Sequence, residues 1–294
     1  MASRGLRIHA PAKVNLHLAV GPTRPDGYHE LATVFQALSF GDTVTITPAS
    51  AFSLSCVPDL GLAGSANLAY RAACEMSARF GRPLGYSIAI EKRIPAGGGL
   101  GGASTDAAAV VEGLATLWGL NVAGPEVLDL ARSLGADVPF FFEGGAALFT
   151  GRGDVLDRPL RSLDAPIVLV KPAEPVGTGA AYIAFDAAPA PQAPPVDRLA
   201  DALQAGDTEA VASLLYNNMT DASIGLVPEV GTVLALVGGT PGVVGAAMAG
   251  SGSTVFGLCA DEAAAEAVAG IARAAGFWSV ATRSADHGCV LEPA

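Results

Sequence analysis

Apolar and polar residues alternate in several short stretches of the first ninety or so residues. This alternation predicts strands with one buried face, at Leu6–His9, Val14–Val20, Thr43–Thr47 and Tyr86–Ile90. A helical spacing of apolar residues predicts helices at Asn67–Phe80, Asp106–Leu117 and Pro125–Leu134. Gly81 and Gly119 are suitable C-terminal stops, and proline suits a first helical position.

The rest of the chain carries further strands and helices without a regular alternation of the two. We expect strands at Ala146–Gly151, Ile167–Lys171, Val255–Cys259 and Cys289–Leu291. We expect helices at Val196–Leu203, Thr208–Leu215 and Asp261–Ala275. Hairpin-like strands with separate helices favour an α+β fold over a βαβ repeat. We divide the chain into an N-terminal domain, residues 1–150, and a C-terminal domain, residues 151–294.

Composition and charge narrow the classes of function. The 294 residues are 51% hydrophobic and 15% charged, which is typical of a folded globular protein. A formal net charge of −11 argues against a nucleic-acid or anionic-membrane partner. The Pro/Ala-rich stretch Ala187–Pro195 predicts an exposed loop.

Three features bear on the compartment. The four cysteines lie far apart and form no C-x-x-C pair, so we expect buried thiols in a reducing environment. The first 13 residues lack the uninterrupted apolar core of a signal peptide. Glycines and hydroxyls interrupt the apolar segment Val243–Ala260, which favours buried structure over a membrane span. We therefore expect a cytoplasmic protein, either a monomer or a weak homodimer.

The segment Gly97–Gly102, with five glycines in six positions, is the most informative part of the chain. It follows a predicted strand and Pro95-Ala96, and it precedes a helix that we expect to begin at Ser104-Thr105-Asp106. Glycines allow backbone N–H groups to approach an anion closely, and a helix N-terminus adds unpaired N–H groups. We therefore predict a phosphate-binding loop, not a flexible linker. We expect valine at Gly99 or Gly101 to block phosphate binding and to leave the fold largely intact.

Known glycine-loop signatures fit this segment poorly. It satisfies G-x-G-x-x-G, but a dinucleotide-binding unit needs the glycines directly after a buried strand and an acid about twenty residues later. Here Glu91–Pro95 intervenes, and no such acid follows. A Walker A loop is excluded because no Gly-Lys-Ser/Thr follows, and the H-R-D and D-F-G motifs of protein kinases do not occur.

The order Pro-x-Gly-Gly-Gly-Leu-Gly-Gly-x-Ser, followed by an Ala-rich helix, resembles the ATP loop of the GHMP kinase superfamily. Ala10–Leu18 resembles the first motif of that superfamily, and Ala249–Thr254 its third glycine motif. Gly21–Glu30 and Leu134–Pro139 are similar to segments of one member family, the 4-diphosphocytidyl-2-C-methyl-D-erythritol kinases. The resemblance implies a two-domain fold with the site in the cleft between the domains. It also implies ATP-dependent phosphorylation of the 2-hydroxyl of a cytidine diphosphate-linked sugar alcohol in the non-mevalonate isoprenoid pathway.

The resemblance assigns catalysis to Lys13 and Asp137. A carboxylate in the turn at Asp137 can accept the proton of a hydroxyl that attacks the γ-phosphate, although aspartates in turns are also common caps. A lysine at position 13 can pair with it and offset charge on the phosphoryl group, although it could equally be a solvent-facing strand residue. Asn15 shares a strand face with Lys13 and either orients the substrate hydroxyl or satisfies a backbone group.

In the resembling family, Tyr28 and His29 hold the cytidine, Thr178 gives a hydroxyl contact and Tyr182 supplies a second ring, where many relatives have phenylalanine. From the residues alone, Tyr28-His29 is as consistent with turn structure. The ATP-binding residues that we expect are Asn67, Lys92, Pro95, Ala96, Gly97, Gly98, Gly99, Leu100, Gly101, Gly102, Ala103, Ser104 and Thr105. The third glycine motif adds Gly250, Ser251 and Gly252.

Some assignments keep a competing interpretation. Asn67 could cap a helix instead of lying near adenine. Ser104 and Thr105 could touch phosphate or Mg²⁺, which we expect with the nucleotide, but no acidic metal ligand can be named. His9, His17 and His287 have no ligand spacing and are interpreted as structural. The alternatives for the whole chain are a GHMP kinase for homoserine or mevalonate, a catalytically silent relative, and a nicotinamide oxidoreductase.

Overall fold

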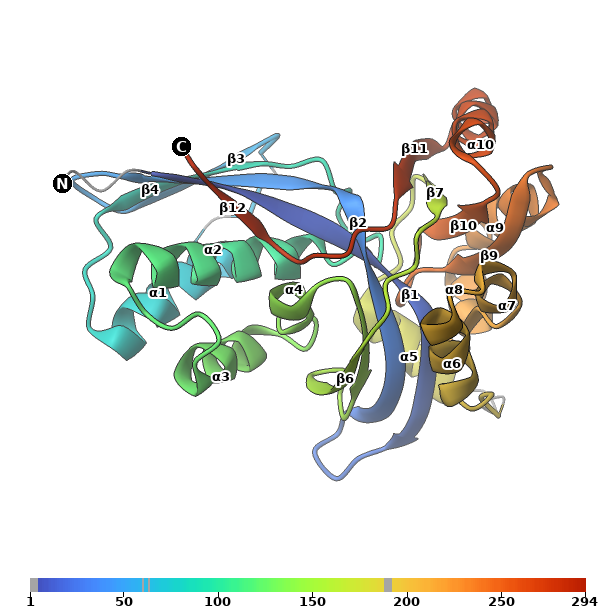
Figure 1. Ribbon diagram of the computed structural model, residues 1–294, viewed down its shortest axis with the longest axis horizontal. Helices are drawn as coiled ribbons and strands as arrows, with labels where there is room; N and C mark the ends of the chain where they lie inside the picture. Colours follow the sequence, from blue (N-terminus) through green and yellow to red (C-terminus); the bar gives the residue numbers. More distant parts are fainter. Residues whose placement is uncertain (1–4, 60, 63, 188–191) are drawn as a thin grey trace.

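The computed structural model describes residues 5–59, 61–62, 64–187 and 192–294. Two sheets organise these residues (Figure 1). The first has the order β12–β1–β2–β4–β3, with β5 and β6 joined through β2, and β8 joined to β1. Its strands are β1 (Leu6–Thr23), β2 (His29–Pro48), β3 (Ser53–Val57), β4 (Tyr86–Glu91), β5 (Ala146–Thr150), β6 (Val155–Leu160), β8 (Tyr216–Asn217) and β12 (Val290–Pro293).

The second sheet has the order β11–β7–β10–β9 and is antiparallel throughout. Its strands are β7 (Pro166–Lys171), β9 (Val243–Met248), β10 (Val255–Cys259) and β11 (Trp278–Arg283). The helices are α1 (Leu68–Phe80), α2 (Gly102–Trp118), α3 (Pro125–Leu134), α4 (Phe140–Glu143), α5 (Thr178–Asp186), α6 (Asp197–Ala205), α7 (Thr208–Ser213), α8 (Thr220–Leu226), α9 (Glu229–Gly239) and α10 (Glu262–Ala274). A 3₁₀ turn covers Gly64–Ala66. This architecture confirms the α+β fold expected from the sequence.

β1 and β2 form a long antiparallel pair (Figure 1). The pair extends from the first half of the molecule, which contains α1 to α3, into the second half, which contains the second sheet and α5 to α10. The sequence pattern predicted two separate strands where β1 is continuous. The register shifts between Pro11 and Lys13, where proline supplies no N–H to the ladder. The interruption is therefore an irregularity within one strand, and it places Lys13 and Asn15 directly after it.

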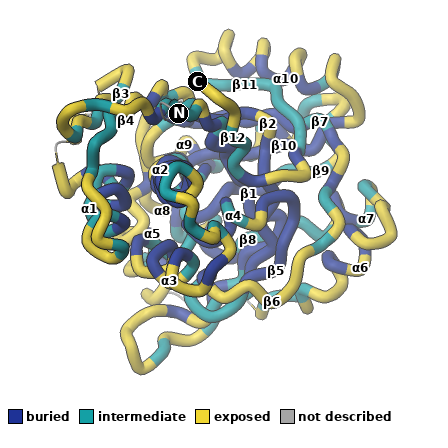
Figure 2. The backbone as a smooth tube through the Cα atoms, turned by 60° about the vertical axis from the view of Figure 1, so that its left-hand side comes forward, coloured by how far each residue is buried: buried dark blue, intermediate teal, exposed yellow. Residues whose placement is uncertain are grey.

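Helix α2 is the central helix of the first half. Every residue from Thr105 to Ala115 is buried, so the helix is enclosed on all sides. It packs against α1, β1 and β2, and Figure 2 shows its burial together with that of β1 and β5. The loop that precedes α2 is therefore attached to a rigid element.

The last described segment returns to the first sheet. Ser284 bridges to Leu38, and the Cys289 N–H donates to the Phe141 carbonyl at 3.1 Å. β12 then pairs antiparallel with Leu6–His9 of β1. Residues 284–293 thus lie against both the first sheet and the segment that follows Asp137.

The pattern of apolar residues missed several elements. Helices α5, α8 and α9 and strands β3, β6, β9 and β11 were not predicted. Part of the predicted exposed loop Ala187–Pro195, residues 188–191, lies outside the described residues. So do residues 1–4 of the N-terminal stretch that was examined for a signal peptide.

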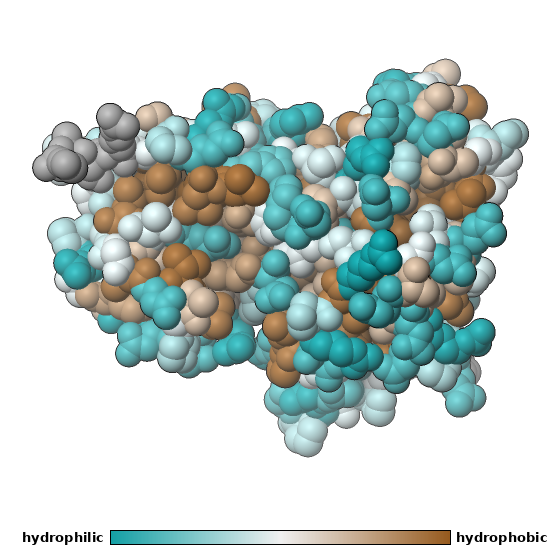
Figure 3. Space-filling view, in the orientation of Figure 1, coloured by the Kyte–Doolittle hydropathy of each residue, from teal (hydrophilic) through white to brown (hydrophobic). Residues whose placement is uncertain are grey.

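No described helix is both long enough and apolar enough to cross a bilayer. On the face in Figure 3, apolar areas are interspersed with hydrophilic side chains, and larger apolar areas lie on the left, where Figure 1 places α2 and β12.

Candidate active site

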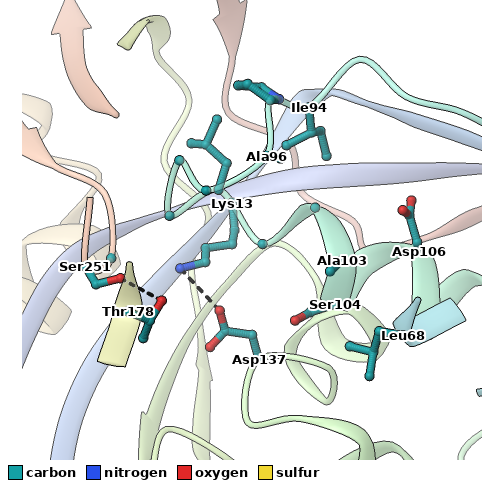
Figure 4. Close-up of a pocket in the computed structure, with 18 of the residues that line it drawn as sticks. Lys13, Leu68, Ile94, Ala96, Ala103, Ser104, Asp106, Asp137, Thr178 and Ser251 are labelled. Atoms are coloured by element: carbon teal, nitrogen blue, oxygen red, sulfur yellow. Dashed lines mark hydrogen bonds and ion pairs between the residues drawn. The ribbon is translucent and has the colours of Figure 1, made fainter. Parts of the chain in front are cut away.

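A cavity of about 410 Å³ lies where the two halves meet. The glycine loop and the start of α2 form one wall, and β1 and β2 contribute side chains to another. The turn that carries Asp137, the start of α1, the start of α5 and the loop that follows β9 also contribute to the lining (Figure 4). All these segments were picked out separately by sequence motifs except β2.

The glycine loop leads directly into α2. Gly101 is the N-cap residue with φ +76°, a conformation that favours glycine. The helix begins at Gly102, two residues before the predicted start, because the glycine loop itself supplies the first turn. The Thr105 N–H donates to the Gly101 carbonyl, so the N–H groups of residues 102–104 have no acceptor within the helix. These N–H groups lie at the end of α2 that borders the cavity, where a bound anion could accept hydrogen bonds from them.

The loop glycines are also packed tightly against the rest of the protein. A Cβ at Gly99 would lie 2.1 Å from the Ala249 carbonyl oxygen, and one at Gly101 would lie 2.8 Å from Phe141 Cζ. A larger side chain at either position therefore disturbs the fold, and the expectation that it would affect phosphate alone was wrong. Sequence spacing could not show that residues 249–252 press against this loop.

Lys13 and Asp137 meet at the wall of the cavity. Lys13 Nζ lies 3.4 Å from Asp137 Oδ2 and donates to Asn15 Oδ1 at 2.8 Å. The Lys13 side chain is 4% exposed and that of Asp137 is 34% exposed. A Cβ at Gly250 would lie 3.4 Å from Lys13 Nζ. The buried ammonium therefore lies between the carboxylate and the third glycine motif, and the carboxylate is open to the cavity (Figure 4).

Lys92 is held by two buried carboxylates. Its Nζ forms ion pairs with Asp42 on β2 and, at 2.6 Å, with Asp106 on α2. Asp42 Oδ1 also accepts the Ile94 N–H at 2.8 Å. Burial raises the pKa of Asp106, opposed by the charge of Lys92. This triad ties the start of α2 to β2 and β4, so the charge of Lys92 is already balanced although its side chain lines the cavity.

Glu112, nearly three turns along α2, supports a prediction about stability. It is buried, and desolvation raises its pKa from 4.5 to about 8. Between these values the folded state keeps a proton that the unfolded state releases, so stability should fall as pH rises through this window, by at most about 1.4 kcal/mol per pH unit. Glu112→Gln should be more stable than the wild type above pH 8, with the difference shrinking towards pH 5, in thermal unfolding across this range. Equal melting temperatures at every pH would contradict the raised pKa.

The second half contributes hydroxyls and an aromatic ring. Thr178 Oγ1, at the start of α5, lies 3.2 Å from Ser251 Oγ of the third glycine motif. Tyr182 lines the cavity, and burial together with the charge of Asp137 raises its pKa to about 12. Its ring stacks on His29 with centroids 5.2 Å apart and an interplanar angle of 25°. The hydroxyl of Tyr182 thus stays protonated and can donate a hydrogen bond.

Tyr28 and His29 do not line the cavity in this structure. His29 Nδ1 lies 2.9 Å from the Gly21 carbonyl and Nε2 lies 3.4 Å from Asp186 Oδ1. Tyr28 is 56% exposed in the turn between β1 and β2, with the Arg152 guanidinium 4.8 Å from its ring centroid. The contacts of His29 fit the structural interpretation of this pair.

The cavity brings together most of the other predicted residues. The lining includes Asn15, Asn67, Lys92, Pro95, Ala96, Ala103, Ser104, Thr178, Tyr182, Gly250, Ser251 and the whole glycine loop. Asn67 also caps α1, because its Oδ1 accepts the Ala69 N–H at 2.9 Å. Thr105 is fully buried, and neither it nor Gly252 lines the cavity.

Family models match both halves of the chain. Residues 67–145 match the GHMP kinases N terminal domain and residues 199–276 match the GHMP kinases C terminal domain. A 4-diphosphocytidyl-2-C-methyl-D-erythritol kinase of Streptomyces coelicolor is 39% identical over 92% of each chain. One of Nocardia farcinica is 42% identical over 89% of this chain and 87% of its own. The chain belongs to the 4-diphosphocytidyl-2-C-methyl-D-erythritol kinase family.

Solved structures agree with this family membership. A crystal structure of 4-(cytidine 5'-diphospho)-2C-methyl-D-erythritol kinase has a TM-score of 0.80 and 38% identity, covering 95% of this chain and 98% of its own. A homoserine kinase from Cytophaga hutchinsonii has a TM-score of 0.74 at 20% identity and shares the fold. The GHMP kinase fold expected from the motifs is therefore confirmed.

Besides Asp42 and Asp106, sequence reasoning missed other polar residues beside the site, among them Thr33 and Lys171. Thr33 on β2 lines the cavity and is 1% exposed. Lys171, which ends β7, is buried, donates to the Pro172 carbonyl at 3.0 Å and has its pKa lowered by desolvation. A Cβ at Gly98 would lie 3.4 Å from Lys171 Cδ, so this cation lies behind the glycine loop. A lysine directly after an apolar run, followed by proline, was the available signal.

Proposed function

We propose that this protein transfers the γ-phosphoryl group of ATP to the 2-hydroxyl of 4-diphosphocytidyl-2-C-methyl-D-erythritol, giving ADP and the 2-phosphate. The family membership supports the substrate and the reaction. The observation that carries the chemistry is the Lys13–Asp137 pair, 3.4 Å apart on the wall of the cavity that the glycine loop also lines. A base, a cation and a phosphate-binding loop at one cavity are the parts that phosphoryl transfer needs.

In this proposal Asp137 accepts the proton of the substrate hydroxyl while its oxygen attacks the γ-phosphorus and the bond to the ADP oxygen breaks. Lys13 offsets the negative charge on the transferring group and holds Asp137 in place. The N–H groups of residues 102–104 bind phosphate oxygens at the N-terminus of α2. Catalysis then consists mostly of positioning and charge stabilisation.

Mg²⁺ is expected with the nucleotide, and the residues present fit a metal held mainly by phosphates and water. Among the described residues, no group of three or more His, Cys, Asp or Glu side chains could form a metal site. Ser104 and the carboxylates of Asp106 and Asp137 line the cavity and could supply an oxygen ligand, and Asp106 is ion-paired with Lys92. Mg²⁺ keeps several waters and takes few protein ligands in such sites, and when bound it would neutralise charge on the phosphates.

An assay of ATP consumption across a panel of alcohols tests the proposed function. The panel should include the cytidylyl substrate, homoserine and mevalonate, because GHMP kinases for the last two share this fold. We expect turnover with the cytidylyl substrate in large excess over the others. Preference for another alcohol would leave the kinase class in place and exclude the named substrate, and no turnover with any alcohol would favour a silent relative.

Tyr182 is the ring that we expect to stack on the cytosine. Tyr182→Ala should raise the KM for the cytidylyl substrate by about 5- to 150-fold, since stacking contributes about 1–3 kcal/mol per base. Tyr182→Phe keeps the ring and is the matched control, with a KM near that of the wild type. The KM for ATP should change little in both variants. An unchanged KM for the cytidylyl substrate in Tyr182→Ala would place the base elsewhere.

The remaining expectations stay predictions. They are the nucleotide roles of Asn67, Lys92 and Thr105, the cytidine contacts of Tyr28, His29 and Thr178, and the domain boundary at residue 150. A cytoplasmic location and a monomeric or weakly dimeric state also stay predictions.

A further inference from the structure

Thr33 lies at the end of a buried chain of hydrogen bonds that leads to Lys13. Its Oγ1 lies 2.8 Å from the His17 carbonyl oxygen and 2.8 Å from Asn15 Nδ2. Asn15 Oδ1 lies 2.8 Å from Lys13 Nζ. Thr33 and Asn15 are each 1% exposed and Lys13 is 3% exposed. Although these residues border the cavity, their side chains are almost entirely shielded from solvent, so each group depends mainly on its neighbours for hydrogen bonds.

The direction of every bond in the chain follows from proton counting. A threonine hydroxyl has one proton, and the His17 carbonyl can only accept, so that proton is committed to His17. Thr33 Oγ1 can then only accept from Asn15, which turns the amide nitrogen of Asn15 towards Thr33. The amide oxygen is left facing Lys13, whose ammonium can only donate.

We propose that Thr33 is a positioning residue, which acts through Asn15 to hold the Lys13 ammonium beside Asp137. The inference rests on the proposed function, in which Lys13 and Asp137 carry the chemistry. Without the Thr33 hydroxyl, the Asn15 amide nitrogen loses its buried acceptor and nothing prevents the amide from turning. Its N–H groups would then face the ammonium, and Lys13 would lose the acceptor that fixes it.

Thr33→Val tests the inference because valine keeps the shape of threonine and lacks the hydroxyl. We expect kcat to fall about tenfold or more, since small displacements of a catalytic group slow the reaction strongly, while the KM for ATP changes less than twofold. Thr33→Ser restores the hydroxyl and should recover most of kcat. Loss of kcat in the serine variant equal to that in the valine variant would overturn the inference, because it would make the packing of the methyl group responsible.

A double-mutant cycle separates action through Asn15 from a direct contact of Thr33 with substrate. In an Asn15→Ala background, Thr33→Val should lower kcat by less than twofold, because the chain is already broken. The same fold loss in both backgrounds would overturn the inference. A wild-type protein without turnover on the panel of alcohols would instead count against the proposed function.

A readout without catalysis tests the hydrogen-bond chain itself. The Asn15 side-chain amide, assigned in NMR spectra by its loss in Asn15→Ala, should exchange its protons slowly in the wild type and in Thr33→Ser, and at least tenfold faster in Thr33→Val. Equal protection in all three proteins would overturn the inference whatever the activity. Matching melting temperatures and backbone spectra would show that each variant is folded.

Discussion

Replacing Asp137 with asparagine should lower kcat by about 100-fold or more while the protein still binds both substrates. Asparagine keeps the shape of the side chain but cannot accept the proton of the attacking hydroxyl. The buried Lys13 ammonium loses its counter-charge but keeps its hydrogen bond to Asn15 and can still donate to the asparagine carbonyl, so we expect the variant to fold with reduced stability. Steady-state kinetics with the cytidylyl substrate, together with calorimetric titration of a non-hydrolysable ATP analogue, separate turnover from binding.

Glu143→Gln is the matched control for this substitution. Glu143 lies six residues further along the chain, is exposed at the end of α4 and does not line the cavity. It should turn over at the wild-type rate. Wild-type turnover in Asp137→Asn would remove Asp137 from the mechanism.

Replacing Ala103 with aspartate should weaken ATP binding on the order of 100-fold. Ala103 is exposed in the first turn of α2 and lines the cavity. A carboxylate there repels the phosphates and competes for the free N–H groups, yet it is favourable for the helix because it lies at the positive end of the dipole. The melting temperature should therefore stay the same or rise while nucleotide affinity falls.

Ala103→Asn controls for size, because asparagine has the shape of aspartate without the charge. It should bind the ATP analogue much more tightly than the aspartate variant in calorimetric titration. If the two variants bound equally, steric blocking would explain the loss. Unchanged affinity in Ala103→Asp would show that the phosphates do not lie at this helix N-terminus.

The parts of the site that could be predicted from the sequence are those with a local physical signature. Five glycines before an Ala-rich helix indicate an anion-binding loop whatever the tertiary structure around them. Asn67, directly before a helical apolar pattern, has the signature of an N-cap, and it caps α1. Lys13, Asn15 and Asp137 were found through motif resemblance, and the structure places all three at one cavity.

The parts that could not be predicted depend on distant segments. Lys92 was expected to bind the nucleotide, but it pairs with Asp106 and with Asp42, which lies fifty residues earlier on β2. Thr33 occupies a strand position where a hydroxyl would ordinarily be interpreted as solvent-facing, and its partners become apparent only when β1 pairs with β2. Tyr28 lies in the turn between β1 and β2, so its distance from the cavity depends on the conformation of that turn, which the sequence pattern does not specify.

The pairing of β12 with β1 has a consequence for folding during synthesis on the ribosome. Leu6–His9 is among the first described segments to leave the ribosome, and its partner, residues 290–293, is among the last. Until then this edge of β1 lacks its ladder partner, and an unpaired edge is a template for pairing with other chains. The Cys289 N–H, which holds Phe141 close behind Asp137, arrives equally late. Completion of this half therefore waits until residues 289–293 have been made, so a nascent chain that lacks them cannot hold its phosphoryl-transfer site in the final form.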